Sequence, residues 1–455
     1  LEAHTLGWSA LRQRLQEYPP QRAAAITGLE LATITDLAEQ YGRVRPGLIK
    51  IADGLQRNLN GGQTVRAICT LPALTGQYGV RGGGLAYSTS DSLRWDAGTV
   101  HYWDQCPPQV RQVNMNRLGA ALLGEVSDPP IKSLYVFGSN PAAIAPNAGK
   151  VLAGLQRDDL FTVVHELFMT DTADYADIVL PATSQLEHAD LHKAYGHTML
   201  AYNAQAIPAY GQAKCNWDVM RLLAQEMDFS EPWLQQTSEQ VIAEVLAATA
   251  AKQEALDGVT LERLKKSGFA ALKVKPEVPF SQGHFPTASG KVALYCQELA
   301  DQGLDPLPGW VDREDGALAA DKDRFPAEDA LFLISGAAHH FVSSSFGNHS
   351  EFLRREGSPF AEIHEEDAAP RNIQDGDMVI LENSRGWCEL RAVVTENNRP
   401  GVVVSPKGRW HKLSNGRNVN WLTTDALGDM AGQSTYHSSQ VWLRRKPLSN
   451  NGNYA

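Results

Sequence analysis

The chain has 455 residues, of which 43% are hydrophobic and 20% charged, and its formal net charge is -11. Single cores stop growing at roughly 250–300 residues, so at least two domains are expected. The acidic balance and the scattered Lys and Arg residues argue against a nucleic-acid partner, and the sequence contains no run of about 18 apolar residues that could span a membrane.

The cysteines and the N-terminal stretch indicate the cellular compartment and whether the sequence is a fragment. No two of the five cysteines form a C-x-x-C clip, so we expect reduced, buried thiols rather than disulfides, an iron–sulfur site or structural zinc. The stretch LEAHTLGWSALRQRL has no signal-peptide core and no initiator Met, and it is typical of the middle of a helical segment. We therefore expect a fragment of a longer, cytoplasmic protein.

The first 130 residues show an α/β rhythm. Leu6, Leu11 and Leu15 recur near the helical period, which predicts helices within residues 1–45. A short strand is expected at 47–54, followed by a helix and a glycine-rich loop at 60–84. Residues 85–130 are weakly periodic and predict a long loop with some helix.

Residues 131–325 continue this rhythm. The stretches 133–138, 159–166 and 177–181 are continuous apolar runs, as expected for strands of a parallel sheet that is covered on both faces. Helices are expected at 147–156, from 170–176 onwards, at 216–227 and at 238–256. From residue 326 short strands alternate with turns, which predicts a β-barrel over 326–447 with strands at 330–336, 377–383, 387–395, 401–406 and 440–445.

Two of the expected parallel strands end in residues that suit a nucleotide. Gly138 allows close approach to the backbone, Asn140 and Pro141 open the next helix, and Glu166 could accept hydrogen bonds from a ribose or a guanine edge. The alternative is a simple turn with a solvated acid.

A second cluster contains Glu187, His188, His192 and His197. If this stretch is helical, His188 and His192 share one face, a spacing that suits a metal and would favour a metal-dependent hydrolase using Glu187, His188 and His192, although Gly196 argues against a continuous helix. The H-E-x-x-H order is absent, however, and solvated or cofactor-facing histidines are the alternative.

Two further polar stretches lie in the expected barrel. The stretch 335–350 follows the first barrel strand and suits an anionic or heteroaromatic ligand, or else forms a loop that caps its own backbone. The stretch 418–437 offers amide and hydroxyl partners for a heterocycle, from Asn418, Asn420, Asp425, Gln433 and Tyr436.

In this order the stretches resemble the molybdopterin oxidoreductase family, which includes DMSO reductases, nitrate reductases and formate dehydrogenases. The motifs that carry the resemblance are VFGSNPA, VVHELFMTDTADYADIVLPATSQLE, TASGKVALY, HEEDAAPRNIQDGDMVILENSRG and VNWLTTD. The resemblance implies parallel-sheet, Rossmann-like α/β domains (1–130 and 131–325) followed by a C-terminal double-psi β-barrel domain (326–447).

The resemblance also implies a cofactor, in which molybdenum or tungsten is held by two molybdopterin guanine dinucleotides. It places a guanosine diphosphate site, with Glu187 near the pterin, at Gly138, Asn140, Pro141, Glu166, Phe168, Thr170, Asp171 and Asp177. From the barrel, pterin or phosphate contacts are implied for Ser335, Gly336, His340, Phe341, Ser343, Ser345, Asn420 and Tyr436.

Two departures from the family matter. The family's N-terminal portion, with its iron–sulfur cluster and metal-ligating residue, is not in this sequence, so the fragment is expected not to complete the reaction centre alone. Thr89 and Ser90 stand where formate dehydrogenases carry Arg and Gly, which argues against formate unless Arg94 substitutes.

The expected function is therefore a two-electron redox reaction on a small substrate, with an electron-transfer partner protein. No catalytic residue is assigned, although the histidines at 188, 192 and 197 are candidates for proton transfer. Besides the hydrolase, the remaining alternative is a structural or electron-relay subunit that kept the fold and lost the metal.

Overall fold

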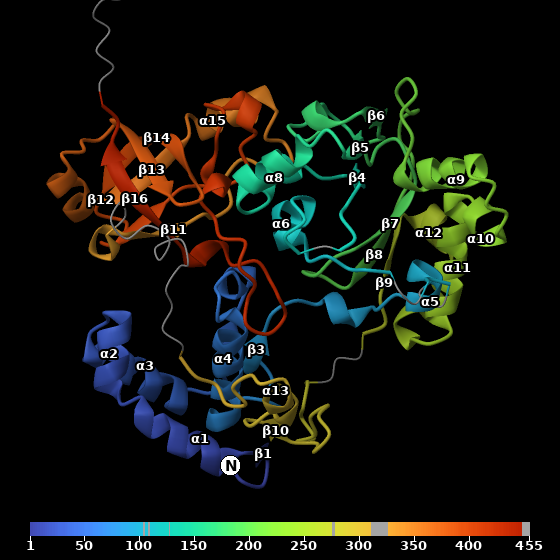
Figure 1. Ribbon diagram of the computed structural model, residues 1–455. Coiled ribbons are helices and arrows are strands. Elements are labelled where there is room, and N and C mark those ends of the chain that lie inside the picture. The colour runs from blue at the N-terminus through green and yellow to red at the C-terminus, as the bar shows by residue number, and fades with distance from the viewer. Residues whose placement is uncertain (103–104, 108–109, 127, 275–277, 311–325, 448–455) are drawn as a thin grey trace, which may run out of the picture.

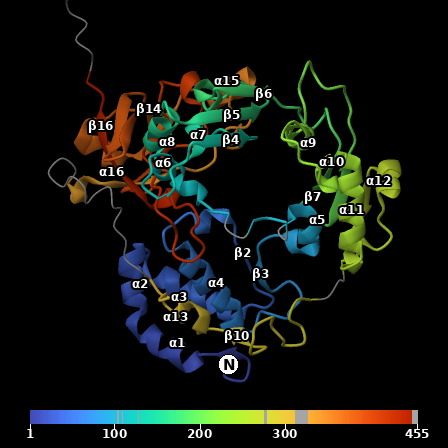
Figure 2. The same cartoon turned by 45° about the vertical axis from the view of Figure 1, so that its right-hand side comes forward.

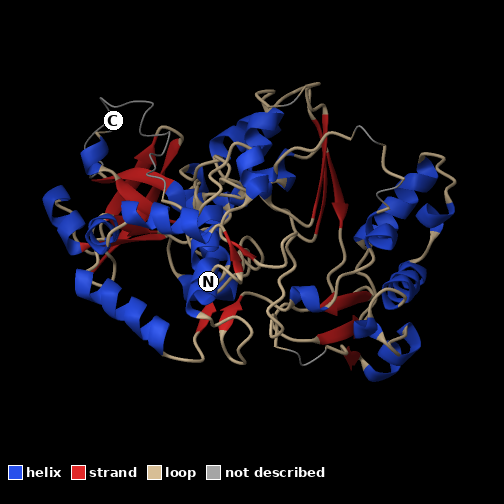
Figure 3. Cartoon of the chain, turned by 90° about the horizontal axis from the view of Figure 1, so that it is seen from below, coloured by secondary structure: helices blue, strands red, loops and turns tan. Residues whose placement is uncertain are grey.

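The computed structural model describes residues 1–102, 105–107, 110–126, 128–274, 278–310 and 326–447. Four regions can be followed in Figure 1: N-terminal helices, a three-stranded parallel sheet, a lobe of helices around α9–α12, and a barrel. Seen from below, the barrel and the α9–α12 lobe lie at opposite ends of the molecule (Figure 3).

The N-terminal region is helical, as the leucine spacing predicts. Its helices are α1 (Trp8–Arg14), α2 (Pro20–Thr27) and α3 (Leu31–Arg43). Just before α1, the short strand β1 (Thr5–Leu6) pairs in parallel with β10 (Val292–Ala293). Gly7 is required at this junction, because its φ is +88° and a Cβ there would lie 2.3 Å from the Cβ of Tyr295.

A β-α-β unit follows. The strands β2 (Leu48–Lys50) and β3 (Gly84–Ala86) are parallel neighbours, and α4 (Gly61–Thr75) lies between them in the chain. The amides of Gly62 and Gln63 at the start of α4 donate to the carboxylate of Asp429, at 2.9 and 3.1 Å. A carboxylate from the C-terminal region thus satisfies the exposed donors of this helix.

The stretch from 85 to 130 contains some helix, as predicted. Its helices include α5 (Ala97–His101) and α6 (Leu118–Leu122). The second packs against α8 (Ala148–Leu155), with Leu122 and Val151 fully buried.

The parallel sheet is confirmed. Its strands are β4 (Ser133–Phe137), β5 (Phe161–Glu166) and β6 (Ile178–Pro181), arranged in that order with parallel pairing. The expected helix start at 170–176 is a single 3₁₀ turn (Ala173–Tyr175). Since parallel strands end at one edge, the residues after β4 and β5 lie side by side.

The lobe beyond this sheet corrects one expectation. Residues around His192 form the strand β7 (Asp190–Lys193) rather than a helix, and this strand pairs with β8 (Met199–Asn203) in an antiparallel sheet. The third strand is β9 (Phe269–Ala271). The helices of this lobe are α9 (Asn216–Glu226), α10 (Pro232–Gln235), α11 (Ser238–Ala250) and α12 (Leu261–Ser267).

The barrel is closed and has six strands, in the order β11-β15-β12-β14-β13-β16. They are β11 (Leu331–Ile334), β12 (Phe360–His364), β13 (Met378–Asn383), β14 (Gly386–Thr395), β15 (Val402–Val404) and β16 (Ser439–Arg445). Two pairs, β11·β15 and β12·β14, are parallel, and the other pairs are antiparallel. The finer double-psi description stays a prediction.

Short helices complete the fold and the barrel core fills its interior. The helices are α7 (Pro141–Ile144), α13 (Gln297–Asp301), α15 (Ser350–Glu356) and α16 (Glu365–Ala368). Leu333, Ile363, Leu381 and Val403 are fully buried in the barrel, where alternate residues of each strand point inward. Among the described residues, no helix is long and apolar enough to cross a membrane.

Hydrophobic clusters join segments on both sides of the expected boundary at residue 130. Leu93 packs with Leu200 and Leu246 in the α9–α12 lobe, and Leu11 packs with Leu294 and Leu307. The proposed division at 130 and 325 stays a prediction, and these two clusters cross the boundary at 130.

Candidate cofactor site at the junction of the parallel sheet and the barrel

Gly138, at the carboxyl end of β4, is open on its outer side. Its φ is +55°, its amide donates to the carbonyl oxygen of His165 at 3.2 Å, and a Cβ there would meet no atom within 4 Å. The residue therefore presents bare backbone at the edge of the sheet where ligands of parallel sheets bind.

Asn140 holds the neighbouring turns together. Its side chain is 1% exposed; Oδ1 accepts from Thr172 N at 3.1 Å and Thr172 Oγ1 at 2.8 Å, and Nδ2 donates to Asp171 Oδ2 at 3.2 Å. Pro141 is buried at the first position of α7, where its missing N–H leaves no donor unpaired. Asn140 thus positions the edge through bonds within the protein.

Thr170 and Asp171 join the sheet to the barrel. Asp171 Oδ1 accepts from Lys412 N at 2.9 Å, and the carbonyl oxygen of Thr170 accepts from Lys412 Nζ at 3.1 Å. Thr170 Oγ1 accepts from Ala173 N at 3.2 Å. Both residues are buried, so they fix the turn after β5 against the C-terminal region.

Glu166 and Phe168 face a more open surface. Glu166 ends β5, its Oε2 accepts from Leu167 N at 3.0 Å, and burial raises the pKa of its carboxyl. Phe168 is 57% exposed and lies between the exposed Leu167 and Met169. Three consecutive exposed apolar residues beside a half-buried carboxyl suit a flat ligand with hydrogen-bonding edges.

Asp177 does not join this group. It precedes β6, and its Oδ2 accepts from Thr162 N at 2.7 Å, while its own amide donates to the carbonyl oxygen of Thr162. Thr162 stands near the start of β5, so this pair lies at the opposite edge of the sheet from Gly138 and Glu166. The structure therefore separates Asp177 from the strand ends with which the resemblance grouped it.

The acid and histidines after β6 do not form a metal site. Glu187 accepts from Ser184 N, Ser184 Oγ and Tyr210 N, and these bonds lower the pKa of its carboxyl. His188 shares a 2.9 Å hydrogen bond with Thr183 Oγ1, and His192 lies in β7. Across the described part of the chain, no group of three His, Cys, Asp or Glu side chains is placed to hold a metal.

His197 belongs to the turn between β7 and β8, and Nδ1 of its ring accepts from Met199 N at 3.1 Å. The strand that replaces the expected helix spreads the histidines apart and removes the geometric basis for the hydrolase.

The loop after β11 forms the side of the candidate site that belongs to the barrel. Ser335 is fully buried and its Oγ has no hydrogen-bond partner, while a Cβ on Gly336 would meet no atom within 4 Å. Ser343 has a φ of +48° and packs against Gly408, where any Cβ would lie 2.1 Å from the Ser343 carbonyl oxygen. Ser345, in the same loop, is exposed.

His340 and Phe341 anchor this loop. The carboxylate of Glu356 accepts from the amides of His339 and His340 and from His340 Nδ1, the last at 2.9 Å. Burial works to raise the pKa of Glu356, but these hydrogen bonds hold it below its usual value. Phe341 is buried, with the guanidinium of Arg409 5.9 Å from its ring centre.

The barrel and the sheet meet through two asparagines. Asn418 Nδ2 donates to the carbonyl oxygens of Ala143 and Arg409, and Asn420 Nδ2 donates to that of Ile144 at 2.8 Å. Figure 2 shows α7 and α8 lying against the barrel side of the molecule. Asn420 is fully buried, and its Oδ1 has no partner.

A cavity of about 290 Å³ opens where these parts meet. It is lined by residues of β4 and of the turn into α7, including Tyr135, Phe137, Ser139 and Pro141, and by Tyr436 from the C-terminal region. Tyr436 is buried, which raises the pKa of its hydroxyl. Aromatic and proline walls with a few polar groups are typical of a site for a flat, heterocyclic ligand.

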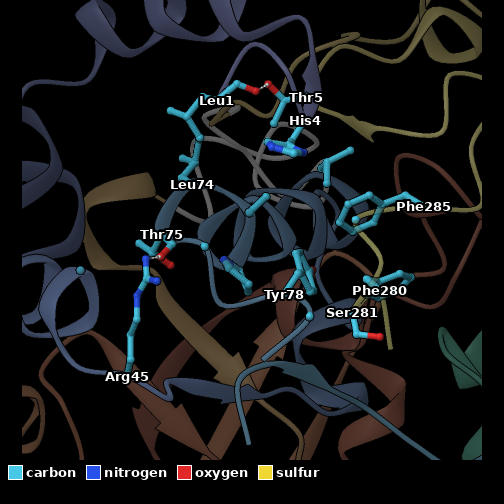
Figure 4. Close-up of a pocket in the computed structure, with 17 residues that line it drawn as sticks. Leu1, His4, Thr5, Arg45, Leu74, Thr75, Tyr78, Phe280, Ser281 and Phe285 are labelled. Atoms are coloured by element: carbon cyan, nitrogen blue, oxygen red, sulfur yellow. Dashed lines mark hydrogen bonds between the residues drawn. The ribbon is translucent and has the colours of Figure 1, made fainter. Parts of the chain in front are cut away.

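A larger cavity, of about 670 Å³, lies elsewhere. Figure 4 shows its wall, in which Leu1, His4 and Arg45 face Tyr78, Phe280 and Phe285. None of the residues implied by the resemblance lines it. The chemistry of the strand ends therefore belongs to the smaller junction cavity.

Polar atoms without partners test whether the junction fits a pterin dinucleotide. Ser335 Oγ, Asn420 Oδ1, His411 Nε2 and Tyr135 OH are buried and make no hydrogen bond in the structure. Buried polar groups are normally paired, so unpaired donors and acceptors in this region fit a ligand rich in both, and Tyr135 among them lines the junction cavity itself. The residues present fit a pterin dinucleotide.

Sequence reasoning missed several residues here. Lys407 Nζ lies 4.5 Å from the centre of the Tyr436 ring, and Arg57 donates to Ser434 Oγ at 2.7 Å. His437 follows Tyr436 directly. The sequence shows that Lys407 follows the expected strand 401–406, but it does not show that Lys407 lies near Arg57.

Comparisons with known proteins agree with this arrangement. Residues 16–226 match the family model of molybdopterin oxidoreductases, and residues 331–440 match the molydopterin dinucleotide binding domain. The chain is 39% identical over 447 residues to the probable oxidoreductase YoaE of Bacillus subtilis, covering 98% of this chain and 63% of that protein.

More distant relatives and a solved structure extend the likeness. The F420-dependent formate dehydrogenase 1 subunit alpha of Methanococcus maripaludis is 27% identical, with 89% of this chain and 60% of that protein covered. The fold is similar to that of acetylene hydratase from Pelobacter acetylenicus, with a TM-score of 0.76, 21% identity and coverage of 98% of this chain and 67% of that one.

The chain spans less than two thirds of the length of these curated relatives, and the expected fragment status stays a prediction. The two family models, which cover the parallel-sheet region and the barrel, and the 39% identity to an oxidoreductase establish the kinship. The chain belongs to the molybdopterin oxidoreductase family.

Proposed function

We propose that this chain is the part of a molybdenum- or tungsten-dependent oxidoreductase that binds two molybdopterin guanine dinucleotides. The cofactor, when bound, supplies a metal centre for two-electron oxidation or reduction of a small substrate. The proposal assigns no metal ligand and no iron–sulfur cluster to residues of this chain.

The observation that carries this proposal is the junction cavity. It lies where the carboxyl end of β4 meets the C-terminal region, and Gly138 next to it presents open backbone. The barrel adds Ser335 and Asn420, each with a buried polar atom that has no partner. Open backbone on one side and unpaired polar atoms on the other are what a long, polar dinucleotide requires.

The residues of the chain have separate tasks in this proposal. Gly138 and Phe168 face the nucleotide, while Asn140 and Asp171 hold the two strand-end turns at a fixed spacing. Tyr436 closes the cavity and excludes water from the pterin. Glu187 accepts three hydrogen bonds from its own loop, so it shapes the turn after β6.

Formate is not favoured as the substrate. Arg94, the residue that could have replaced the missing clamp, is paired with Asp91 through a 3.1 Å hydrogen bond and its side chain is 74% exposed. A guanidinium engaged in this way on the surface is poorly placed to bind a substrate carboxylate in a closed site. Oxidation or reduction of another small molecule is the better proposal.

Analysis of metal and nucleotide tests the proposal. The complete natural polypeptide would be purified without oxygen and its molybdenum, tungsten and guanine content measured. Metal with about two guanine nucleotides per chain supports the proposal. Absence of both from properly matured protein overturns it and favours a structural or electron-relay subunit that kept the fold.

A further inference from the structure

Three basic side chains gather beside the junction cavity, from segments far apart in the sequence. Lys407 follows β15 and lies over the ring of Tyr436, with Nζ 4.5 Å from the ring centre. Arg57 lies in the segment before α4 and donates to Ser434 Oγ at 2.7 Å. His437 N donates to the carbonyl oxygen of Arg57 at 2.9 Å, which ties the two segments together.

The positive charges of Arg57 and Lys407 repel each other, and both disfavour a third charge on His437. Burial lowers the pKa of Lys407, and the charge of Arg57 lowers it further. Burial, then Lys407, then Arg57 lower the pKa of His437. Among the residues that the structure describes, none of the three has an ion pair with a carboxylate.

A cluster of this kind is unfavourable in the absence of an anion. Partly buried charges that lack a partner are destabilising, and proteins normally pair them. The surrounding polar groups are unpaired as well: both side-chain polar atoms of Gln433 and Nδ1 of His437 are buried and make no hydrogen bond. Guanidinium, ammonium, imidazole and amide groups together form a set of donors that matches phosphate oxygens.

Tyr436 connects this cluster with the cofactor site. Its ring lines the junction cavity and also carries Lys407 on its face. We propose that Arg57, Lys407 and His437 form the binding site for a pyrophosphate group, that of one of the two pterin dinucleotides. This inference rests on the proposed function for the identity of the ligand, but the site itself is testable without the pterin.

The direct test is calorimetric titration with inorganic pyrophosphate. The complete natural polypeptide would be produced in cells that cannot make pterin, as wild type and as Lys407→Gln. The substitution keeps most of the side-chain length and removes the charge, so we expect at least about tenfold weaker binding. Lys273→Gln is the matched control, because Lys273 pairs with Asp257 on the surface of the other lobe.

A second readout separates binding from a merely structural role. Removing one of the two repelling charges should raise the melting temperature of the ligand-free protein by about 1–2 °C, while Lys273→Gln should not raise it. Higher stability together with weaker pyrophosphate binding is the expected signature. A lower melting temperature with lost binding would assign Lys407 a structural role and overturn the inference.

The remaining outcomes are also decisive. Equal pyrophosphate affinity in wild type, Lys407→Gln and Arg57→Gln would show an adventitious ion only and overturn the inference. Binding that depends on Lys407, in a protein whose mature form contains no guanine, would leave the anion site standing while the proposed cofactor fails. If the mature protein contains guanine but Lys407→Gln binds pyrophosphate as tightly as wild type, the proposed cofactor stands and the proposed anion site is overturned.

Discussion

The side-chain amide of Asn418 donates a 2.9 Å hydrogen bond to the carbonyl oxygen of Ala143, and so links the barrel to the turn after the parallel sheet. The same Nδ2 atom donates at 2.7 Å to the carbonyl oxygen of Arg409. One buried amide group thus serves two carbonyls in two different regions, which fixes how the halves of the cofactor site face each other.

Asn418→Asp should therefore destabilise the junction. An aspartate would point a carboxylate oxygen at two carbonyl oxygens, and leaving such buried groups unsatisfied costs about 2–4 kcal/mol. Thermal denaturation would measure the loss. The control is Asn397→Asp, a change of the same kind at an exposed position, and similar losses in both variants would contradict the prediction.

Gly138→Ala should separate stability from cofactor binding. A Cβ there meets no protein atom within 4 Å, so the expected loss is the roughly 1 kcal/mol of a left-handed backbone. Guanine content should fall much more, because the methyl group would occupy the space of the nucleotide.

Gly211→Ala is a closely matched control, since Gly211 also has a positive φ, of +57°, and open surroundings. Similar melting temperatures are expected for the two variants, with guanine lost only in Gly138→Ala. Full guanine content in Gly138→Ala would remove this glycine from the site.

Glu166→Gln should stabilise the protein most at neutral pH. Burial raises the pKa of Glu166 in the folded state, so folding favours the protonated form. The stability linked to this group is present below its ordinary value near 4.5 and is lost as pH rises through the folded pKa.

At pH 7 the glutamine should raise the melting temperature by about 1–2 °C, and at pH 4 the difference should shrink. Glu396→Gln, at an exposed position, should show neither effect. A melting temperature below wild type at pH 7 would refute the explanation.

Cys388 should be inert in the folded protein. It is fully buried in the barrel core, and burial raises the pKa of its thiol to about 12. Alkylation at pH 8, followed by mass spectrometry, should modify the partly exposed Cys296 and leave Cys388 untouched until denaturant is added. Early modification of Cys388 would show that the barrel opens.

The sequence predicted the parallel sheet well because each strand there is a continuous apolar run with a clear stop. It predicted five of the six barrel strands, and it missed β12 because Phe360–His364 runs directly into the acidic helix α16. The metal alternative at His188 and His192 depended on a helix, whereas His192 lies in β7 and His188 precedes this strand. A spacing of four residues does not by itself distinguish a helix from a strand, because residues four apart share a face in both.

The site was harder to predict than the fold. The cofactor contacts of Asn140 and Asn420 stay a prediction, and the side chains of these residues form hydrogen bonds with Thr172, Asp171 and Ile144 within the protein. Arg57 and Lys407 stand 350 residues apart in the sequence, and only the folded chain shows that they share a surface. A contact between residues so far apart in the sequence cannot be recognised from the composition around either of them.

The pairing of β1 with β10 has a consequence for biosynthesis. Arg14 forms its 2.7 Å ion pair with Asp305, a residue 291 positions later, and Leu11 is buried in a cluster whose other buried members are Leu294 and Leu307. Contacts of such long range form late, because they require closure of a large loop. Until residue 307 has left the ribosome, α1 lacks the partners from 292–307 and has only Leu74 of α4 from that cluster, so its apolar side is more exposed to chaperones in the nascent chain.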